Sequence, residues 1–139
     1  MKTTKSNLIK LPGLIDVHVH FRDPGQTHKE DFYSGTTAAL AGGYTMVLDM
    51  PNNLEPITSA SRLASKIQSA KSKVVCDVGF HFGSVGEQMD ELKKVHKKVT
   101  GLKLYLNQTT GGFIIDTERM KKIYTFWHAL TKTKPILLH

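Results

Sequence analysis

The sequence contains very little cysteine and no long apolar segment. Cys76 is the only cysteine among 139 residues, which excludes an intramolecular disulfide framework and favours a reducing compartment. No stretch approaches the roughly 18 apolar residues of a membrane-spanning helix. The first 13 residues are basic and lack the apolar run of a signal peptide. These absences predict a cytoplasmic protein that does not engage a membrane.

The chain is also too short for a complete (β/α)₈ barrel, which needs roughly 200 residues at the least. Its composition of 40% hydrophobic and 22% charged residues is ordinary for a globular protein and unlike that of disordered chains. The length alone permits one domain of typical size, with enough chain to bury a core.

The net charge is +7, but the basic residues are dispersed along the chain. The densest group lies at helical spacing opposite a set of apolar residues, which is typical of a solvated helix face and not of a nucleic-acid surface. This group comprises Lys93, Lys94, Lys97 and Lys98, and the apolar set comprises Val85, Met89, Leu92 and Val95.

Hydrophobic patterning alternates between strand and helix periods. Strands are expected at residues 14–20, 44–50, 74–82, 101–106 and 135–139, and helices between them, the second over 60–70, the third over 86–98 and the fourth from about Thr117. Thr27 and Glu30 form a possible capping box for the first helix, which Gly42 and Gly43 would end. A spacing of about 30 residues between strands predicts βα units and a parallel sheet, either half of a barrel or a small open α/β sheet.

Two histidines end the first expected strand. Residues two apart on a strand face the same side, so His18 and His20 point in one direction, and Asp16 and Arg22 continue the alternation. Parallel α/β proteins place their sites at this carboxyl end of the strands. Two neutral imidazoles on one face are half of a zinc or transition-metal site, whereas on an edge strand they would be surface residues.

Lys103 lies between Leu102 and Leu104 in the fourth expected strand. If the leucines face the outer helices, Lys103 faces the interior, where a lone ammonium must be paired, lowered in pKa or chemically modified. A neutral lysine amine can add carbon dioxide and form a carbamate that bridges two metal ions. On an edge strand, the same lysine would be solvated.

Two further histidines lie on expected strands. His139 shares the carboxyl rim of the strands with His18, His20 and Lys103, which makes it a candidate metal ligand. His81 lies on the third strand, facing inward with Asp77 and Gly79. We interpret His81 as a hydrogen-bonded interior residue and not as a ligand.

Four segments carry a family resemblance, namely PGLIDVHVHFRDPGQTHKEDFYSGTTAALAGG, DMPNN, GLKLYLNQTTG and PILLH. Because these segments occur in this order, the sequence resembles the dihydroorotases of the amidohydrolase superfamily. The resemblance extends from about Leu11 to His139. The resemblance implies an α/β fold, a partial (β/α)₈ TIM barrel with about strands 1–5 and helices 1–4. It divides the chain into an N-terminal lead-in, residues 1–10, and the N-terminal half of a catalytic domain, residues 11–139, truncated after strand five.

The same resemblance implies a centre of two divalent metal ions, expected to be Zn²⁺. His18 and His20 would be ligands of the more buried ion and His139 a ligand of the second. Lys103 would be the carboxylated lysine that bridges the two ions.

The resemblance also implies which residues bind the substrate. Arg22 would pair with its carboxylate, with help from Asn52, and a planar guanidinium suits this bidentate contact. Thr109 would lie on a mobile loop that closes over the substrate. Thr110 and Gly111–Gly112 depart from some relatives, which carry an aromatic and more polar residues there.

The reaction implied is the reversible, metal-dependent cyclisation of N-carbamoyl-L-aspartate to L-dihydroorotate in de novo pyrimidine synthesis. Allantoinase- and hydantoinase-like cyclic amidohydrolases resemble the same pattern, but they lack an arginine two residues beyond the HxH motif. Arg22 therefore favours dihydroorotase over these alternatives.

The family's further histidine ligand and its aspartate general base would lie beyond His139, so we expect the chain alone to be incomplete and inactive. Three hypotheses follow: the N-terminal part of a dihydroorotase, a subunit completed by a second half-barrel polypeptide, or a non-catalytic dihydroorotase-like scaffold. The expected partners are the small-molecule substrate and either further copies of the chain or aspartate transcarbamoylase, with no nucleic acid and no membrane.

Overall fold

The computed structural model describes residues 9–139. Strands and helices alternate along the chain: β1 (Leu14–Val19), α1 (Phe32–Ala41), β2 (Tyr44–Asp49), α2 (Ala60–Ala70), β3 (Asp77–Gly83), α3 (Met89–Val95), β4 (Gly101–Leu104), α4 (Thr117–Leu130) and β5 (Ile136–Leu138). The lead-in expected over residues 1–10 falls mostly on residues 1–8, which lie outside the described residues.

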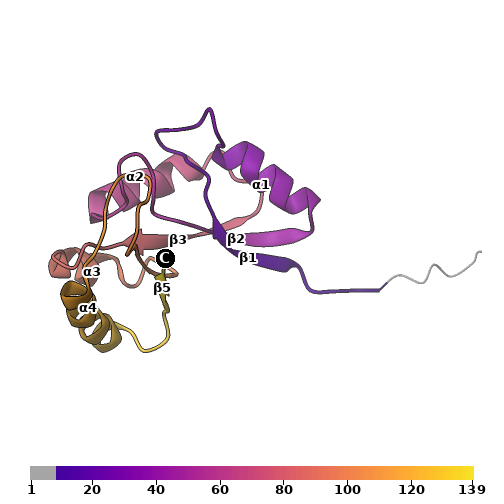
Figure 1. Ribbon diagram of the computed structural model, residues 1–139. Coiled ribbons are helices and arrows are strands. Elements are labelled where there is room, and N and C mark those ends of the chain that lie inside the picture. Colours follow the sequence, from indigo (N-terminus) through magenta and orange to yellow (C-terminus); the bar gives the residue numbers. More distant parts are fainter. Residues whose placement is uncertain (1–8) are drawn as a thin grey trace, which may run out of the picture.

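The five strands form one continuous arrangement in the order β1–β2–β3–β4–β5, and every neighbouring pair is parallel. Figure 1 shows the strands curling, with the helices packed around their outer side. Each helix thus serves as the crossover between two adjacent strands. The expected partial barrel with five strands and four helices is confirmed, and its strands bring their carboxyl ends to one rim.

Helix α1 begins later than the sequence predicts. Asp31 is the N-cap: its carboxylate accepts from the backbone N–H of Ser34 at 2.8 Å, and the Ser34 hydroxyl accepts from the backbone N–H of Asp31. The capping box expected at Thr27 and Glu30 is therefore wrong. Residues 22–30 form turns instead, because they include Pro24 and Gly25, which interrupt a helix.

The boundaries of β3 and α3 differ most from the expectation, and β4 ends at Leu104 and not at residue 106. Strand β3 begins at Asp77 and not at residue 74, because the backbone N–H of Val74 is bound in the turn that follows α2. Helix α3 covers Met89–Val95 and not 86–98, since Gly86 has a φ of 88° outside the helical region. The remaining helices agree with the apolar spacing, and α2 matches its expected range.

The hydrophobic core lies between the sheet and the helices. Its largest fully buried apolar side chains are contributed by every helix and by β3 and β4, and they include Phe32, Leu63, Phe82, Leu92, Leu102, Leu104, Ile123 and Trp127. The four lysines expected on a solvated helix face are exposed. Leu102 and Leu104, which flank Lys103, belong to this core, so they face the helices as expected.

Strand β1 forms one edge of the sheet, and its apolar side chains are not fully covered. Leu14, Ile15 and Val17 are each about half exposed, at 49%, 56% and 56%. An apolar strand edge of this kind is a surface on which further strands or chains pack. Across residues 9–139, no helix is both long and apolar enough to cross a membrane.

Candidate metal and substrate site

The candidate residues converge on the rim formed by the carboxyl ends of the strands. His18 belongs to β1, His20 and Arg22 follow it, and Asn52 follows β2. Lys103 lies in β4, Thr109 in the loop after β4, and His139 directly after β5. Segments that are more than 100 residues apart in the sequence therefore contribute to one rim, because all five strands are parallel.

The two histidines of the HxH motif lie side by side. Their ring centroids are 5.1 Å apart. Burial lowers the pKa of His18, and the charges of Lys103 and His139 lower it further. Burial also lowers the pKa of His20, with a smaller contribution from the charge of Arg22. Both imidazoles are therefore held in the neutral form that coordinates a metal ion.

Asn52 connects the histidine pair to the loop after β4. Its Oδ1 accepts from Nδ1 of His20 at 2.7 Å, and its Nδ2 donates to the hydroxyl of Thr109 at 3.2 Å. The side chain is buried, at 8% exposure. Asn52 thus orients the His20 ring from one side and contacts the proposed lid from the other.

Arg22 is the only described residue other than glycine with a positive φ, 59°. Its Nη1 donates to the backbone oxygen of Asn52 at 3.3 Å and to the hydroxyl of Thr110 at 3.1 Å. A left-handed backbone costs a non-glycine residue about 1–2 kcal/mol. Such strain is concentrated at functional sites, where it aims a side chain that would otherwise point elsewhere.

Lys103 is buried, at 1% exposure, and no carboxylate of the described residues lies within ion-pair distance of it. Its Nζ donates a long hydrogen bond of 3.4 Å to the backbone oxygen of Leu138 and lies 5.0 Å from the Tyr105 ring centroid. Burial lowers the pKa of this amine. A neutral fraction of the amine is what reaction with carbon dioxide requires.

His139 completes the opposite side of the rim. Its backbone pairs with Leu104 and Leu106, and its ring lies 5.5 Å from that of Tyr105. Lys103 and His139 are therefore both close to the Tyr105 ring. Burial raises the pKa of Tyr105 to about 12, so its hydroxyl remains protonated.

The structure brings the candidate residues together as two adjacent groups. One contains His18 and His20, joined to Asn52 and Arg22, and the other contains Lys103 and His139 around Tyr105. Among residues 9–139, no three His, Cys, Asp or Glu side chains converge closely enough to hold an ion by themselves. The donors nevertheless suit a divalent ion, because a carbamate on the unpaired Lys103 would add two oxygens to neutral imidazoles.

The site residues from His18 to Thr109 lie within a segment, residues 9–120, that matches the amidohydrolase family. This chain belongs to the amidohydrolase family. Members of the family are generally metal-dependent, in keeping with the donor set on the rim.

Similar curated proteins are longer than this amidohydrolase chain. The multifunctional protein CAD of Squalus acanthias is 44% identical over 133 residues, which are 95% of this chain and 6% of that protein. The dihydroorotase of Methanosarcina acetivorans is 38% identical over 130 residues, 92% of this chain and 26% of the enzyme. The allantoinase of Streptomyces avermitilis is 44% identical over 101 residues, 71% of this chain and 23% of the enzyme. The chain therefore spans about a quarter or less of these relatives.

Solved structures agree with the fold. The L-hydantoinase of Arthrobacter aurescens superposes with a TM-score of 0.84 at 23% identity, over 92% of this chain and 29% of that one. The inactive dihydroorotase-like domain of the Chaetomium thermophilum CAD-like multifunctional protein superposes with a TM-score of 0.75 at 25% identity, over 94% and 38%. The partial barrel of the amidohydrolase chain is thus shared by catalytic and inactive domains.

His81 is an interior residue, as the sequence analysis concludes. It is 2% exposed, and its two ring nitrogens lie 3.3 Å from the Val17 oxygen and 3.2 Å from the Thr100 hydroxyl. Both ring nitrogens thus have partners inside the protein, as expected for a hydrogen-bonded interior histidine.

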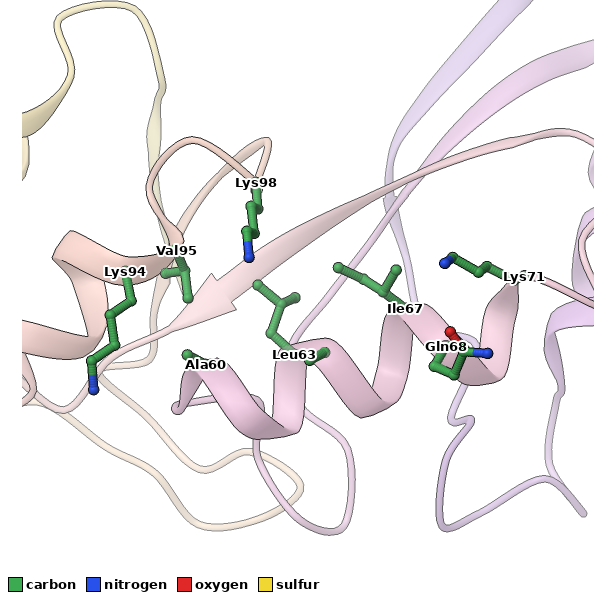
Figure 2. A pocket seen from close by; sticks show the side chains of 9 residues that line it. Ala60, Leu63, Ile67, Gln68, Lys71, Lys94, Val95 and Lys98 are labelled. Atoms are coloured by element: carbon green, nitrogen blue, oxygen red, sulfur yellow. The ribbon is translucent and has the colours of Figure 1, made fainter.

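A groove of about 380 Å³ lies on the outer face of the amidohydrolase chain, between α2 and α3. Figure 2 shows Leu63 and Ile67 on its floor, with Lys71, Lys94 and Lys98 around them. None of the candidate site residues lines it. The rim is therefore the candidate site, since only there do the neutral imidazoles and the guanidinium meet.

Sequence reasoning missed a buried ion pair directly below the rim. Nζ of Lys66, on α2, lies 2.7 Å from Oδ2 of Asp49, the last residue of β2, and both side chains are 1% exposed. One signal was available: Lys66 occupies a position on the apolar stripe of α2, between Leu63 and Ala70. A charged residue on such a stripe requires a buried partner.

Proposed function

We propose that this amidohydrolase chain supplies half of a dihydroorotase site, which interconverts N-carbamoyl-L-aspartate and L-dihydroorotate in pyrimidine synthesis. The observation that carries the proposal is the position of Arg22. Its guanidinium lies beside Asn52, which itself binds His20. A substrate carboxylate at Arg22 would place the reacting amide near the paired imidazoles.

The proposed metal ligands are His18, His20, His139 and Lys103, the last as its carbamate. Together with groups from the remainder of the barrel, they would hold two divalent ions, expected to be Zn²⁺. Such ions polarise a carbonyl and lower the pKa of water when bound. The lowered pKa values of His18, His20 and Lys103 support this assignment.

The residues of the chain itself would bind and enclose the substrate. Arg22 would hold the carboxylate through paired N–H donors, and Asn52 would present its amide beside it. Thr109 and Thr110 already contact Asn52 and Arg22, so the loop after β4 lies over the same space. A substrate that enters must displace these contacts, and the loop would then exclude water from it.

Two alternatives share the fold. One is an allantoinase- or hydantoinase-like hydrolase, favoured by the similarity to the Streptomyces avermitilis allantoinase. The other is a non-catalytic scaffold, favoured by the likeness to the inactive Chaetomium thermophilum domain. Arg22, Lys103 and the histidine pair argue against the scaffold, because a protein without catalysis has no need of a strained arginine, an unpaired buried lysine and two adjacent imidazoles on one rim.

The location and the assembly are part of the proposal. We expect the protein in the cytoplasm, with residues 11–139 forming the first half of the catalytic barrel. A second half-barrel polypeptide, further copies of the chain or aspartate transcarbamoylase are the proposed partners. The similarity to the multifunctional CAD protein supports an association with other enzymes.

The test compares substrates with and without the carboxylate, using the native polypeptide that contains this chain, with its partners and bound metal. Wild-type protein should act on carbamoyl-aspartate and dihydroorotate. Arg22→Met should raise KM for carbamoyl-aspartate roughly 10- to 100-fold. Charge-assisted hydrogen bonds to one ionised group contribute about this much to binding. Activity on hydantoin or allantoin, with none on dihydroorotate, would instead identify the first alternative, and absence of both metal and turnover would identify the scaffold.

A further inference from the structure

Beneath the rim, the ammonium of Lys66 is enclosed by three acceptors. It lies 2.7 Å from Oδ2 of Asp49, 2.9 Å from the backbone oxygen of Met50 and 2.7 Å from Oδ1 of Asn53. The contacts with Met50 and Asn53 are hydrogen bonds, and the contact with Asp49 is an ion pair. All three partners belong to the end of β2 and the loop that follows it, which carries Asn52.

The same acceptors extend to the loop after β1. Oδ1 of Asp49 accepts from the backbone N–H of Phe21 at 3.1 Å, and Nδ2 of Asn53 donates to the backbone oxygen of Pro24 at 3.0 Å. These two contacts lie on either side of Arg22 in the sequence. The Lys66 cluster, meaning Lys66, Asp49 and Asn53, therefore holds the Arg22 loop and the Asn52 loop against each other.

Stability alone does not explain why this cluster is ionic and not apolar. A buried ion pair is often matched or exceeded in stability by apolar residues of the same size, because desolvating two charges offsets their attraction. Apolar residues at both positions 49 and 66 could fill the same volume, but they could not bind the acceptors of the two loops. Methionine at position 66 alone would leave the Asp49 carboxylate buried without its cation. What only the ammonium provides is a defined geometry for the two loops.

We propose that Lys66 is a positioning residue for this site, because its ammonium fixes the Asn52 loop against the Arg22 loop and so sets where the substrate carboxylate binds. The kinetic part of this inference rests on the proposed dihydroorotase function. The structural part, the coupling of two loops through one cation, does not.

The first experiment measures hydrogen exchange at individual amides in the native polypeptide. Lys66→Met should accelerate exchange about tenfold or more at Phe21 and in residues 22–26 and 50–54, because the acceptors of the cluster lose their shared partner. The matched control is Lys134→Met, since Lys134 also donates to two backbone oxygens, those of His96 and Val99, but at the opposite end of the strands. It should accelerate exchange near residues 95–100 and leave the rim unchanged.

The second experiment measures kcat and KM for carbamoyl-aspartate. Displaced carboxylate contacts should raise KM about tenfold or more and change kcat less. A purely structural role would reduce the folded fraction, which lowers the apparent kcat at constant KM. Lys66→Arg, which retains the charge and several donors, should recover part of the wild-type KM.

Asn53→Ala keeps the Asp49–Lys66 ion pair and removes both contacts of the Asn53 side chain, with Lys66 and with the backbone oxygen of Pro24. It therefore tests the proposal if Lys66→Met does not fold. It should accelerate exchange in residues 22–26 and raise KM moderately. The proposal is overturned if the Met or Ala variant folds and leaves both rim exchange and KM at wild-type values. If wild-type protein shows no dihydroorotase activity, the proposed function fails, while the exchange data still decide whether Lys66 couples the loops.

Discussion

The ring of His20 donates from Nδ1 to Oδ1 of Asn52 over 2.7 Å. An amide oxygen only accepts, and Nδ2 of the same amide is used by Thr109, so the amide orientation and the ring tautomer are fixed together. Nε2 of His20 is left with its lone pair. The group that sets the tautomer of this proposed ligand lies on the loop after a neighbouring strand and not beside His20 in the sequence.

Asn52→Leu should therefore weaken metal binding. Loss of the group that orients a histidine ligand typically lowers metal affinity 10- to 100-fold, that is, by about one to two orders of magnitude. The measurement is zinc affinity by chelator competition on the native polypeptide. Asn107→Leu, in the exposed loop after β4, is the control and should retain its affinity. Equal affinities in the two variants would contradict the role given to Asn52.

Lys103→Met should stabilise the metal-free protein and abolish its activity. The amine is buried without a carboxylate partner, so replacing it by an apolar chain of similar length removes a desolvation cost of about 1–3 kcal/mol. Urea unfolding at neutral pH measures the change. Lys66→Met is the natural comparison, because its three partners predict the opposite sign. A loss of stability in Lys103→Met would show that the amine has a stabilising partner.

Gly35→Ala should destabilise the protein, although alanine is the better helix former. Gly35 lies in α1, and a Cβ there would overlap the ring of Phe21, which packs edge-on against Phe32. Overpacking of this kind costs about 1–3 kcal/mol. Gly42→Ala, at the end of the same helix, meets only ordinary contacts at 3.4 Å and should change the unfolding free energy little. Equal effects would show that the Phe21 ring moves aside freely.

Glu91→Gln should change how stability depends on pH. Glu91 lies on α3, and its carboxylate accepts from the backbone N–H of Ala60 at the start of α2 and from Lys94. These bonds lower its pKa below the ordinary 4.5, the bond from Ala60 contributing most. The folded state therefore binds this proton less tightly, so the stabilisation is complete above pH 4.5 and is lost as pH falls through the lower folded value.

The measurement for Glu91 is urea unfolding between neutral pH and pH 3 for wild type and variant. The two curves should be separated at neutral pH and converge in acid. Glu118→Gln is the control, because Glu118 pairs only with Lys121 on its own helix and is highly exposed. A constant separation between wild type and Glu91→Gln at every pH would contradict the assignment.

The alternation of apolar periods was enough to predict the order of the elements and the parallel sheet. Helix α2 and the central strands follow from residues that are buried on one side, such as Leu63 and Leu102. The start of α1 did not follow, because Thr27–Glu30 and Asp31–Ser34 both have the spacing of a capping box. The choice between them depends on turns that bind Gln26 and Lys29.

The candidate residues that lie at the ends of strands could be located from the sequence. His18, His20, Lys103 and His139 reach the same rim because parallel strands end together, which sequence periodicity reveals. The Asp49–Lys66 pair was missed because its partners are 17 positions apart on different elements, and their contact is a product of tertiary packing. Residues that hold a site in place are harder to recognise than residues that carry it.

At Arg22, the left-handed backbone makes the residue that suits the proposed function different from the residue that suits stability. Glycine or asparagine would relieve the strain, since both occupy this region readily. A library selected only for thermal tolerance should therefore enrich glycine and asparagine at position 22, whereas one selected for growth without exogenous pyrimidine should retain arginine. Divergence between the two selections would mark this residue as maintained by its use and not by folding.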